Sequence, residues 1–438
     1  MEGHIIEEII EEFEKDPLPK FIKRELDIPL NSTRAVTIIG LRRSGKTFYL
    51  YQTIEKLLNE GIDKSRIIYI NFEDERLLDF KTEDFTKIIE LYHKRNQDGK
   101  IGYLFFDEIQ NIRGWETFIR RILEKGKFRI FITGSSAKLL SAEIATGLRG
   151  RSLSFHLLPL SFKEFLALRD GKHKAPFTEK GKGALGKLLE EYMAFGGFPE
   201  VGTFEKELRI RLLSDYLDMI IYRDIVERYE VKRLNALKFL IKTLSANYAK
   251  ELSLRKLYNF FVSSGKRLGK SKLYEYFSYL EDIGFVFLLR KFGYGIRETE
   301  GSIPKAYISD TGFAAVAGDA DRSRLLENIV AQELLRKRYY WNPLEEIFYW
   351  KDINGWEVDF VVKEKRDVKQ IIQVAYAVSD PNTMERETRS LVKASKELKC
   401  SNALVITFDY EGRKNKDDLD IAFVPLWKWL LESHETSH

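Results

Sequence analysis

The chain has 438 residues and is almost balanced in charge, with 72 Lys+Arg against 67 Asp+Glu and a formal net charge of +5. Its length favours two to four domains, and its 44% hydrophobic content excludes a disordered or fibrous protein. So small a net charge neither requires nor excludes nucleic acid, so a basic surface has to be sought locally. A single cysteine excludes an intrachain disulfide and a cysteine-type zinc site. Because the acidic start is unlike a signal peptide and no apolar run approaches the ~18 residues of a membrane helix, we expect a cytoplasmic protein without a membrane partner.

The segment 34–61, RAVTIIGLRRSGKTFYLYQTIEKLLNEG, predicts a buried strand, a glycine-bearing loop and a helix. The loop matches the pattern G-x-x-x-x-G-K-[ST] in the structural context that the pattern requires. Its glycines let successive backbone N–H groups face a phosphate at the helix N-terminus. The lysine would reach the β- and γ-phosphates, and the threonine hydroxyl would bind Mg²⁺. We therefore predict ATP and Mg²⁺ as cofactors, with the nucleotide bound by Gly40, Leu41, Arg42, Arg43, Ser44, Gly45, Lys46, Thr47 and Phe48.

A later segment, GYLFFDEIQ, predicts a buried strand that ends in Asp107 and Glu108. Two acids alone would suggest a solvated strand end. Their position about 60 residues after the phosphate loop, on an apolar strand, favours the metal side of a phosphate site instead. Asp107 would hold Mg²⁺ through water, and Glu108 would orient and deprotonate the attacking water.

Two further groups of residues are catalytic candidates. The strand KFRIFITGSS delivers Thr133, Ser135 and Ser136 to the same sheet edge, where one hydroxyl would sense the γ-phosphate or cap the following helix. On a glycine-flanked loop, Arg149 or Arg151 would complete the site of a neighbouring subunit as an arginine finger. The alternative for both arginines is a surface ion pair of little energetic weight.

The motifs GLRRSGKT, FFDEIQ, ITGSSAKLL and LRGR…LLPLSFKEFL resemble the AAA+-like P-loop ATPases of archaea and bacteria that carry a restriction-endonuclease-like C-terminal domain. The resemblance continues through EEYMAFGGFPEV and YRDIVERYEV, and so spans nearly the whole chain. It implies an α/β protein with a P-loop ATPase domain at 1–165, a helical lid at 166–235, a winged helix at 236–312 and a nuclease-like domain at 313–438. In the implied lid, Arg223 is expected to pair with Glu227 on its own helix.

Residues 236–312 predict three helices followed by a hairpin, which is typical of a winged helix. On the third helix, Leu273, Phe277 and Leu280 would face the core, whereas Tyr276 and the lysines would face outward. The basic residues at the start of this helix form a local cluster suited to DNA phosphates. The DNA-contact candidates are Lys266, Arg267, Lys270 and Lys272. A protein–protein module is the alternative.

Residues 322–407 predict the order α-β-β-β-α-β, with a hairpin turn at Asn354-Gly355. This is the order of the restriction-endonuclease-like fold, whose active sites need carboxylates for Mg²⁺ and a lysine two residues after the last of them. The candidate ligands are Glu327, Asp359 with Glu357 on the same strand face, and Gln373. The lysine position holds Ala375, and Lys369 lies too far along the strand to replace it. We therefore expect an inactive nuclease site on a surface that binds DNA or a subunit.

Together these features predict a homo-oligomeric, Mg²⁺-dependent ATPase that binds or remodels DNA, including branched DNA. A slow ATP-hydrolysing switch that acts on a protein partner is the second hypothesis. An ATP-dependent nuclease is the third, and Ala375 argues against it.

Overall fold

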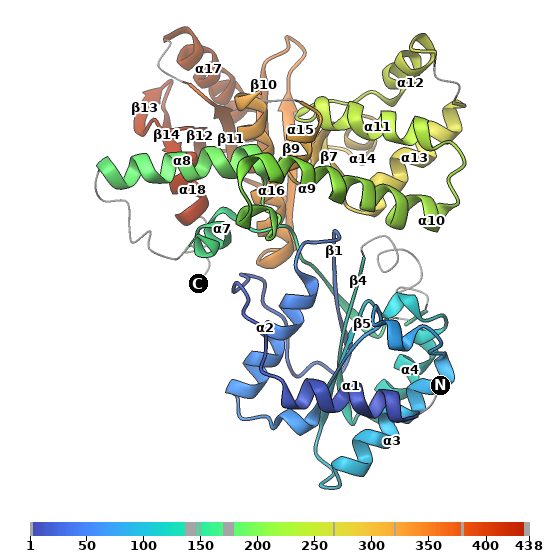
Figure 1. The fold of residues 1–438 in the computed structure, drawn as a ribbon. Coiled ribbons are helices and arrows are strands. Elements are labelled where there is room, and N and C mark those ends of the chain that lie inside the picture. Colours follow the sequence, from blue (N-terminus) through green and yellow to red (C-terminus); the bar gives the residue numbers. More distant parts are fainter. Residues whose placement is uncertain are drawn as a thin grey trace. The chain divides into compact units, whose positions relative to one another are not determined.

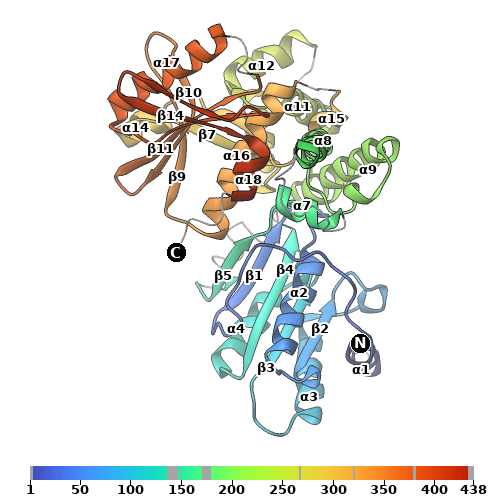
Figure 2. The same cartoon turned by 90° about the vertical axis from the view of Figure 1, so that its left-hand side faces the viewer.

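The computed structural model describes residues 3–135, 147–148, 150–169, 179–265, 268–318, 321–377 and 381–432 (Figures 1 and 2). The chain forms two compact units. The P-loop unit comprises Met1–Leu158 with Asp282–Gly284, and the C-terminal unit comprises Pro159–Glu281 with Phe285–His438. No helix within the described ranges is long and apolar enough to span a membrane.

The P-loop unit is built on a parallel five-stranded sheet with the order β2-β3-β4-β1-β5. The strands are β1 (Ala35–Gly40), β2 (Ile67–Asn71), β3 (Gly102–Asp107), β4 (Phe128–Ser135) and β5 (Ser152–His156). The central strands are continuous apolar runs, as expected of a parallel sheet covered on both faces. Because all five strands run in one direction, the carboxyl ends of β1, β3 and β4 lie at the same end of the sheet.

Helices cover both faces of this sheet. Apolar side chains of α1 (Gly3–Lys15), α3 (Phe85–Arg95) and α4 (Trp115–Lys125) form one core with alternate strand residues such as Ile70, Phe106 and Ile132. On the other face, α2 (Lys46–Asn59) packs against β1, β3 and β4. Single helical turns lie at Lys64–Arg66, Glu75–Leu77, Thr82–Asp84 and Ile109–Asn111.

The C-terminal unit begins with a helical region, as predicted. It comprises α7 (Phe162–Leu168), α8 (Glu179–Phe195), a turn at Val201–Thr203, α9 (Lys206–Met219), a π-helical stretch at Ile220–Val226 and α10 (Glu227–Tyr229). Arg223 forms the predicted ion pair with Glu227, at 3.6 Å.

Three helices and three strands follow: α11 (Leu234–Ala246), β6 (Lys250–Glu251), α12 (Leu254–Ser263), α13 (Lys270–Asp282), β7 (Val286–Lys291) and β8 (Lys305–Ile308), with α14 (Ile296–Glu300) between the last two. Leu273, Phe277 and Leu280 are buried, as predicted. The outward placement of Tyr276 is wrong, because this side chain is only 3% exposed and lies against the turn that precedes α11.

The rest of the chain forms α15 (Gly312–Val316), α16 (Arg322–Tyr340), β9 (Glu345–Lys351), β10 (Glu357–Glu364), β11 (Asp367–Ala375), α17 (Pro381–Leu398), β12 (Ala403–Thr407), β13 (Gly412–Lys416), β14 (Leu419–Pro425) and α18 (Leu426–Glu432). The predicted order of elements up to β12 is confirmed, and so is the β9–β10 turn, where Gly355 has a φ of 85°. The α/β fold class is confirmed as well.

One feature of the C-terminal sheet was not predicted. Its nine strands have the order β13-β14-β12-β11-β10-β9-β7-β8-β6, because β7 pairs in parallel with β9. The strands predicted as a wing are therefore continuous with the sheet formed by β9 to β14. The domain boundaries predicted after residues 235 and 312 both fall within this unit.

Candidate functional site

The phosphate loop joins the end of β1 to the start of α2, and both of its glycines have a structural reason. A Cβ atom on Gly40 would lie 2.3 Å from the carbonyl oxygen of Leu157, so the close approach of the two backbones excludes any larger residue. Gly45 has a φ of 95°, in the left-handed region that glycine adopts without strain. The loop is thus shaped as a cradle at the N-terminus of a helix, which is the geometry that binds phosphate.

Lys46 lies buried at the centre of this loop. Its Nζ atom is 3.3 Å from the carbonyl oxygens of Gly40 and Leu41, and 3.6 Å from Oε1 of Glu108. The ammonium therefore stands between the loop and the acidic end of β3, where it can meet a phosphate chain held by the loop.

Asp107 and Glu108 are tied to the neighbouring strand by Thr133. The Thr133 hydroxyl donates a hydrogen bond to Asp107, and the backbone N–H of Glu108 donates to Thr133 Oγ1 at 3.0 Å. Glu108 has a φ of 50°, an uncommon conformation for a non-glycine residue that is often found at functional sites. Thr133 therefore hydrogen-bonds to both acids and holds them in position.

The two acids differ in their electrostatic surroundings. Burial and the neighbouring charge of Glu108 raise the pKa of Asp107. Burial alone would also raise the pKa of Glu108, but the charges of Lys46 and Arg42, with a hydrogen bond from Gln110, outweigh it and lower this pKa. Glu108 is thus ionised at neutral pH, as a general base must be.

The residues around Asp107 fit Mg²⁺. Thr47 hydrogen-bonds to the Asp107 carboxylate, so the two predicted metal ligands lie together. Asp107 is fully buried and accepts hydrogen bonds from Thr133 and Tyr69. A divalent ion would neutralise its charge there. Hydroxyl and carboxylate oxygens are also the ligands that Mg²⁺ prefers.

Arg24 is a residue of this site that sequence reasoning missed. Its guanidinium donates to the carbonyl oxygens of Ser44, at 2.8 Å, and of Leu158, at 2.5 Å, and its backbone binds the side chain of Gln52. Arg24 thereby links the backbone of the phosphate loop to the segment after β5. Within the described structure, the buried Ser44 hydroxyl has no hydrogen-bond partner, as expected of a group reserved for a phosphate oxygen.

The other predicted loop residues divide by exposure. Leu41 is buried, and Arg42 pairs with Glu73 at 3.3 Å. Arg43 is exposed with a φ of 66°, and Phe48 is half exposed. Exposure of these side chains leaves the backbone N–H groups of the loop as the predicted phosphate donors.

The predicted sensor and finger residues are covered only in part. Ser136, Arg149 and the side chain of Ser135 lie outside the described residues. Arg151 pairs with Glu124 at 2.5 Å, and its carbonyl oxygen accepts from Ala35 at the start of β1. The phosphate loop follows the carboxyl end of β1, whereas Arg151 lies beside the amino end of this strand. Arg151 therefore cannot contact a nucleotide in the phosphate loop of its own chain.

A second polar cluster surrounds Lys305 in the C-terminal unit. The ammonium of this buried lysine lies 2.7 Å from Glu357, 3.0 Å from Glu327 and 3.0 Å from Asp359. Tyr307, also on β8, donates to Glu327 at 2.8 Å. The sequence analysis brought the three acids together correctly, but it missed the lysine, which comes from a strand assigned to another domain.

The fourth predicted member of this cluster is engaged elsewhere. Gln373 accepts the backbone N–H of Asp359 at 3.3 Å and donates to Glu387 of α17 at 2.7 Å. Burial raises the pKa of Glu387, which also pairs with Arg386. Lys369 is half exposed and pairs with Asp367 at 3.7 Å, so it takes no part.

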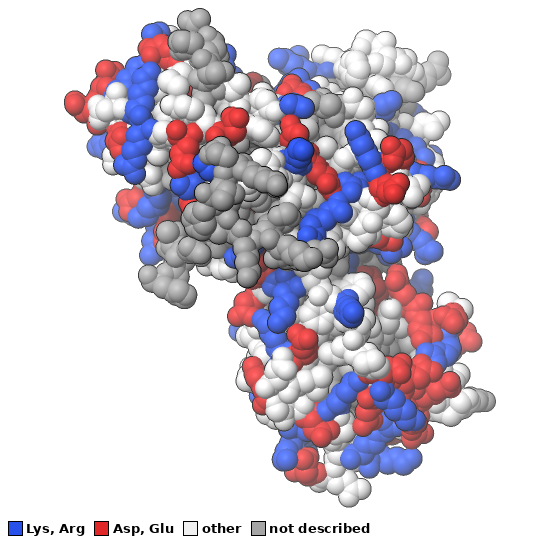
Figure 3. All heavy atoms as spheres, turned by 60° about the vertical axis from the view of Figure 1, so that its left-hand side comes forward, with Lys and Arg blue, Asp and Glu red and all other residues white. Residues whose placement is uncertain are grey.

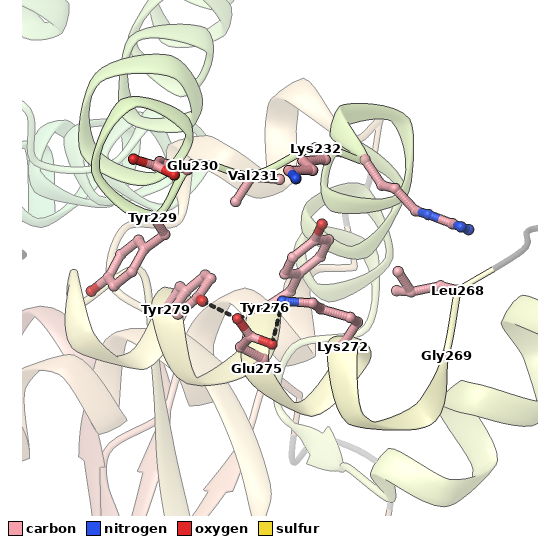
Figure 4. Close-up of a pocket in the computed structure, with 11 residues that line it drawn as sticks. Tyr229, Glu230, Val231, Lys232, Leu268, Gly269, Lys272, Glu275, Tyr276 and Tyr279 are labelled. Carbon is pink, nitrogen blue, oxygen red and sulfur yellow. Dashed lines mark hydrogen bonds and ion pairs between the residues drawn. The ribbon is translucent and has the colours of Figure 1, made fainter.

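A pocket of about 380 Å³ lies between the start of α13 and the turn before α11 (Figure 4). Lys272 enters it from α13 and pairs there with Glu275, which also accepts from Tyr279. The walls combine tyrosines with cations: Tyr229, Tyr276, Tyr279, Lys232, Arg233 and Lys272. Among the predicted DNA contacts, Lys270 is exposed, and Lys266 and Arg267 lie outside the described residues. Elsewhere, basic and acidic side chains are interspersed over the face drawn in Figure 3.

Comparisons with known proteins agree with the P-loop assignment. Residues 32–166 match the AAA domain, and residues 186–324 and 322–429 match two domains of unknown function, DUF8612 and DUF4143. The chain is 37% identical to the uncharacterized protein MJ1544 of Methanocaldococcus jannaschii over 97% of this chain and 94% of that one. It is 31% identical to an uncharacterized protein of Haemophilus influenzae, over 90% and 94%. Among solved structures, the Walker-type ATPase PABY2304 of Pyrococcus abyssi is 15% identical, covers 72% of this chain and 94% of its own, and has a TM-score of 0.43.

Proposed function

We propose that this chain, which belongs to the same family as MJ1544 of Methanocaldococcus jannaschii and carries an AAA domain, is a Mg²⁺-dependent ATPase that acts on DNA. The observation that carries the ATPase proposal is the group formed by Lys46, Asp107, Glu108 and Thr133 at the end of the phosphate loop. These side chains supply a phosphate contact, a metal ligand and an ionised base within one buried site.

Each residue has a distinct part in hydrolysis. The loop amides and Lys46 hold the phosphates, and Thr47 with Asp107 would hold Mg²⁺, which neutralises charge on the phosphate oxygens. Glu108 accepts the proton of the attacking water as the water oxygen bonds to the γ-phosphorus. The bond between that phosphorus and the β–γ bridging oxygen breaks at the same time, and ADP leaves. Thr133 keeps both acids in place.

The test is steady-state ATP hydrolysis by the wild type and two variants. Glu108→Gln keeps the shape but not the charge of the base, so it should bind ATP normally while kcat falls by about 10²-fold or more. Lys46→Ala should instead weaken ATP binding. Glu90→Gln makes the same chemical change on the exposed face of α3 and should leave both quantities unchanged. Full turnover by Glu108→Gln would refute the assignment of the base.

The pocket on α13 supports DNA as the target. Its lining has three cations and three tyrosines beside two carboxylates, Glu230 and Glu275. Cations bind nucleic-acid phosphates, and tyrosines stack on bases. Arg151 lies away from the phosphate loop of its own chain, so a role as an arginine finger would require a neighbouring chain, as in the predicted homo-oligomer. The C-terminal sheet would then be a catalytically inactive, nuclease-like support.

One observation favours the second candidate, a nucleotide-gated switch that binds a protein. Phe260 and Val262 on α12 are 49% and 54% exposed, which suits a protein partner better than DNA phosphates. An ATPase rate that is indifferent to DNA would favour this candidate.

A further inference from the structure

In the cluster around Lys305, three carboxylates surround one cation, as they would in a metal site. The cation here is the ammonium group of a side chain. The three acids come from two elements, Glu327 from α16 and Glu357 and Asp359 from β10. Each places one carboxylate oxygen 2.7–3.0 Å from the same nitrogen atom. Because Lys305 is only 4% exposed, these contacts are made away from bulk water.

We infer that the Lys305 ammonium is the resident cation of this site and occupies the place of a divalent metal ion. Mg²⁺ or Mn²⁺ would need the same oxygen donors at about 2.0–2.2 Å. The carboxylate oxygens instead lie 2.7–3.0 Å from the Lys305 nitrogen, which is the distance of a hydrogen bond to an ammonium and not that of a metal–oxygen bond. In agreement, the described part of the chain contains no group of three or more His, Cys, Asp or Glu side chains placed to hold a metal.

The charge of the cluster supports this assignment. Three carboxylates each place one oxygen within 3.0 Å of the Lys305 ammonium. The other oxygen of Glu357 pairs with Lys351 at 3.1 Å, so the three acids face two ammonium groups. Burial alone would lower the pKa of Lys305, but Tyr307 and the three carboxylates together raise it well above its ordinary value. The lysine therefore stays charged and stays bound.

The position of Lys305 in the fold explains why it remains in the site. It lies on β8, whose neighbours β7 and β6 hold its backbone in register with Leu289 and Glu251. A free metal ion would have to displace a cation that the sheet holds at a fixed point. This goes beyond the proposed function, because it assigns an intramolecular ligand to a site unconnected with ATP.

The inference predicts that removal of the ammonium uncovers a divalent-cation site. Lys305→Met keeps the length of the side chain and removes its charge. Titration with Mn²⁺ in the absence of nucleotide should show binding tighter than in the wild type by about tenfold or more, with a rise in Tm. Adding Asp359→Asn should abolish the gain, since even an indirect support of a metal site is worth about 10–100-fold in affinity. The wild type and all variants have the same phosphate loop, so any Mn²⁺ that binds there contributes equally to each titration and does not affect the difference between them.

Two outcomes would overturn the inference. One is a folded Lys305→Met protein that gains no Mn²⁺ binding. The other is Mn²⁺ binding, or Mn²⁺-dependent DNA cleavage, by the wild type that Asp359→Asn removes. If Lys305→Met does not fold, the wild type and Asp359→Asn alone decide: equal Mn²⁺ affinities support the inference, and weaker binding by Asp359→Asn overturns it. Lys305→Arg, which keeps the charge, should behave like the wild type.

Discussion

At the scale of single residues, Thr133 does more than the sequence suggested. It was one of three hydroxyls proposed to sense the γ-phosphate, and the structure shows it bridging Asp107 to the backbone of Glu108. A single methyl-for-hydroxyl exchange would therefore disturb both the metal ligand and the base.

Thr133→Val should lower kcat and raise the Mg²⁺ concentration needed for half-maximal activity. A hydrogen bond to a charged group contributes about 1.5–3 kcal/mol, so the expected loss is about tenfold or more. Thr133→Ser, which restores the hydroxyl, should recover most of the activity. A valine variant with wild-type kcat and Mg²⁺ dependence would show that the bridge has no catalytic part.

The residues that the sequence predicted well are those with local signatures. Gly40, Gly45 and Lys46 are defined by their spacing within one loop, and their geometry depends on a few neighbours. Arg24 and Lys305 have no such signature. Lys305 binds acids 22 and 54 positions away, and Arg24 binds a loop 20 positions away, so only the folded chain brings them to their partners.

At the scale of elements, the end of α8 is joined to the turn after β8 by Asp310. This buried carboxylate accepts the backbone N–H groups of Gly197 and Gly312, both at 2.8 Å. The preceding Gly196 has a φ of 75°, and a Cβ atom there would lie 1.7 Å from Oδ1 of Asp310. The motif FGGFPEV thus needs glycine at this position for reasons of space and of backbone conformation.

Gly196→Ala should destabilise the C-terminal unit. The left-handed conformation alone costs about 1–2 kcal/mol for a non-glycine residue, and displacement of Asp310 adds to it. Gly186→Ala provides the control, because this glycine lies within α8, which ends just before Gly196, and nothing lies within 4 Å of its Cβ position. There alanine should stabilise the helix by up to about 1 kcal/mol. Urea unfolding measures both, and a Gly196→Ala protein as stable as the wild type would contradict the packing described here.

The sequence predicts correctly those helices and strands whose hydrophobic periodicity is clear. It does not predict features that depend on how separate elements pack against one another. The predicted helices and strands between α11 and β12 occur in the expected order, and β6, α14 and α15 are additions that were not predicted. Tyr276 was placed outward because a single amphipathic helix has one obvious core face, but the turn before α11 covers a second face of α13. The pairing of β7 with β9 likewise joins segments almost 60 residues apart, which no local pattern records.

At the scale of the whole molecule, the α13 pocket connects the C-terminal unit with the proposed DNA partner. Lys232→Ala and Lys272→Ala should each weaken DNA binding about equally for different sequences, because phosphate contacts carry no sequence information. Each should reduce the slope of log K against log salt by about 1. Lys242→Ala removes the same charge from an exposed position of α11 outside the pocket and serves as the control. Unchanged affinity and slope in both pocket variants would place the DNA contact elsewhere.

The proposed function couples ATP hydrolysis at the phosphate loop to the binding or remodelling of DNA. The most direct test is the steady-state rate of ATP hydrolysis with no DNA and with duplex, single-stranded and four-way-junction DNA, using Glu108→Gln as the blank. We predict a basal rate that the blank lacks and that at least one form of DNA increases. A basal rate that no form of DNA changes would contradict the proposed role on DNA, and a rate equal to that of the blank would contradict the assignment of the ATPase site.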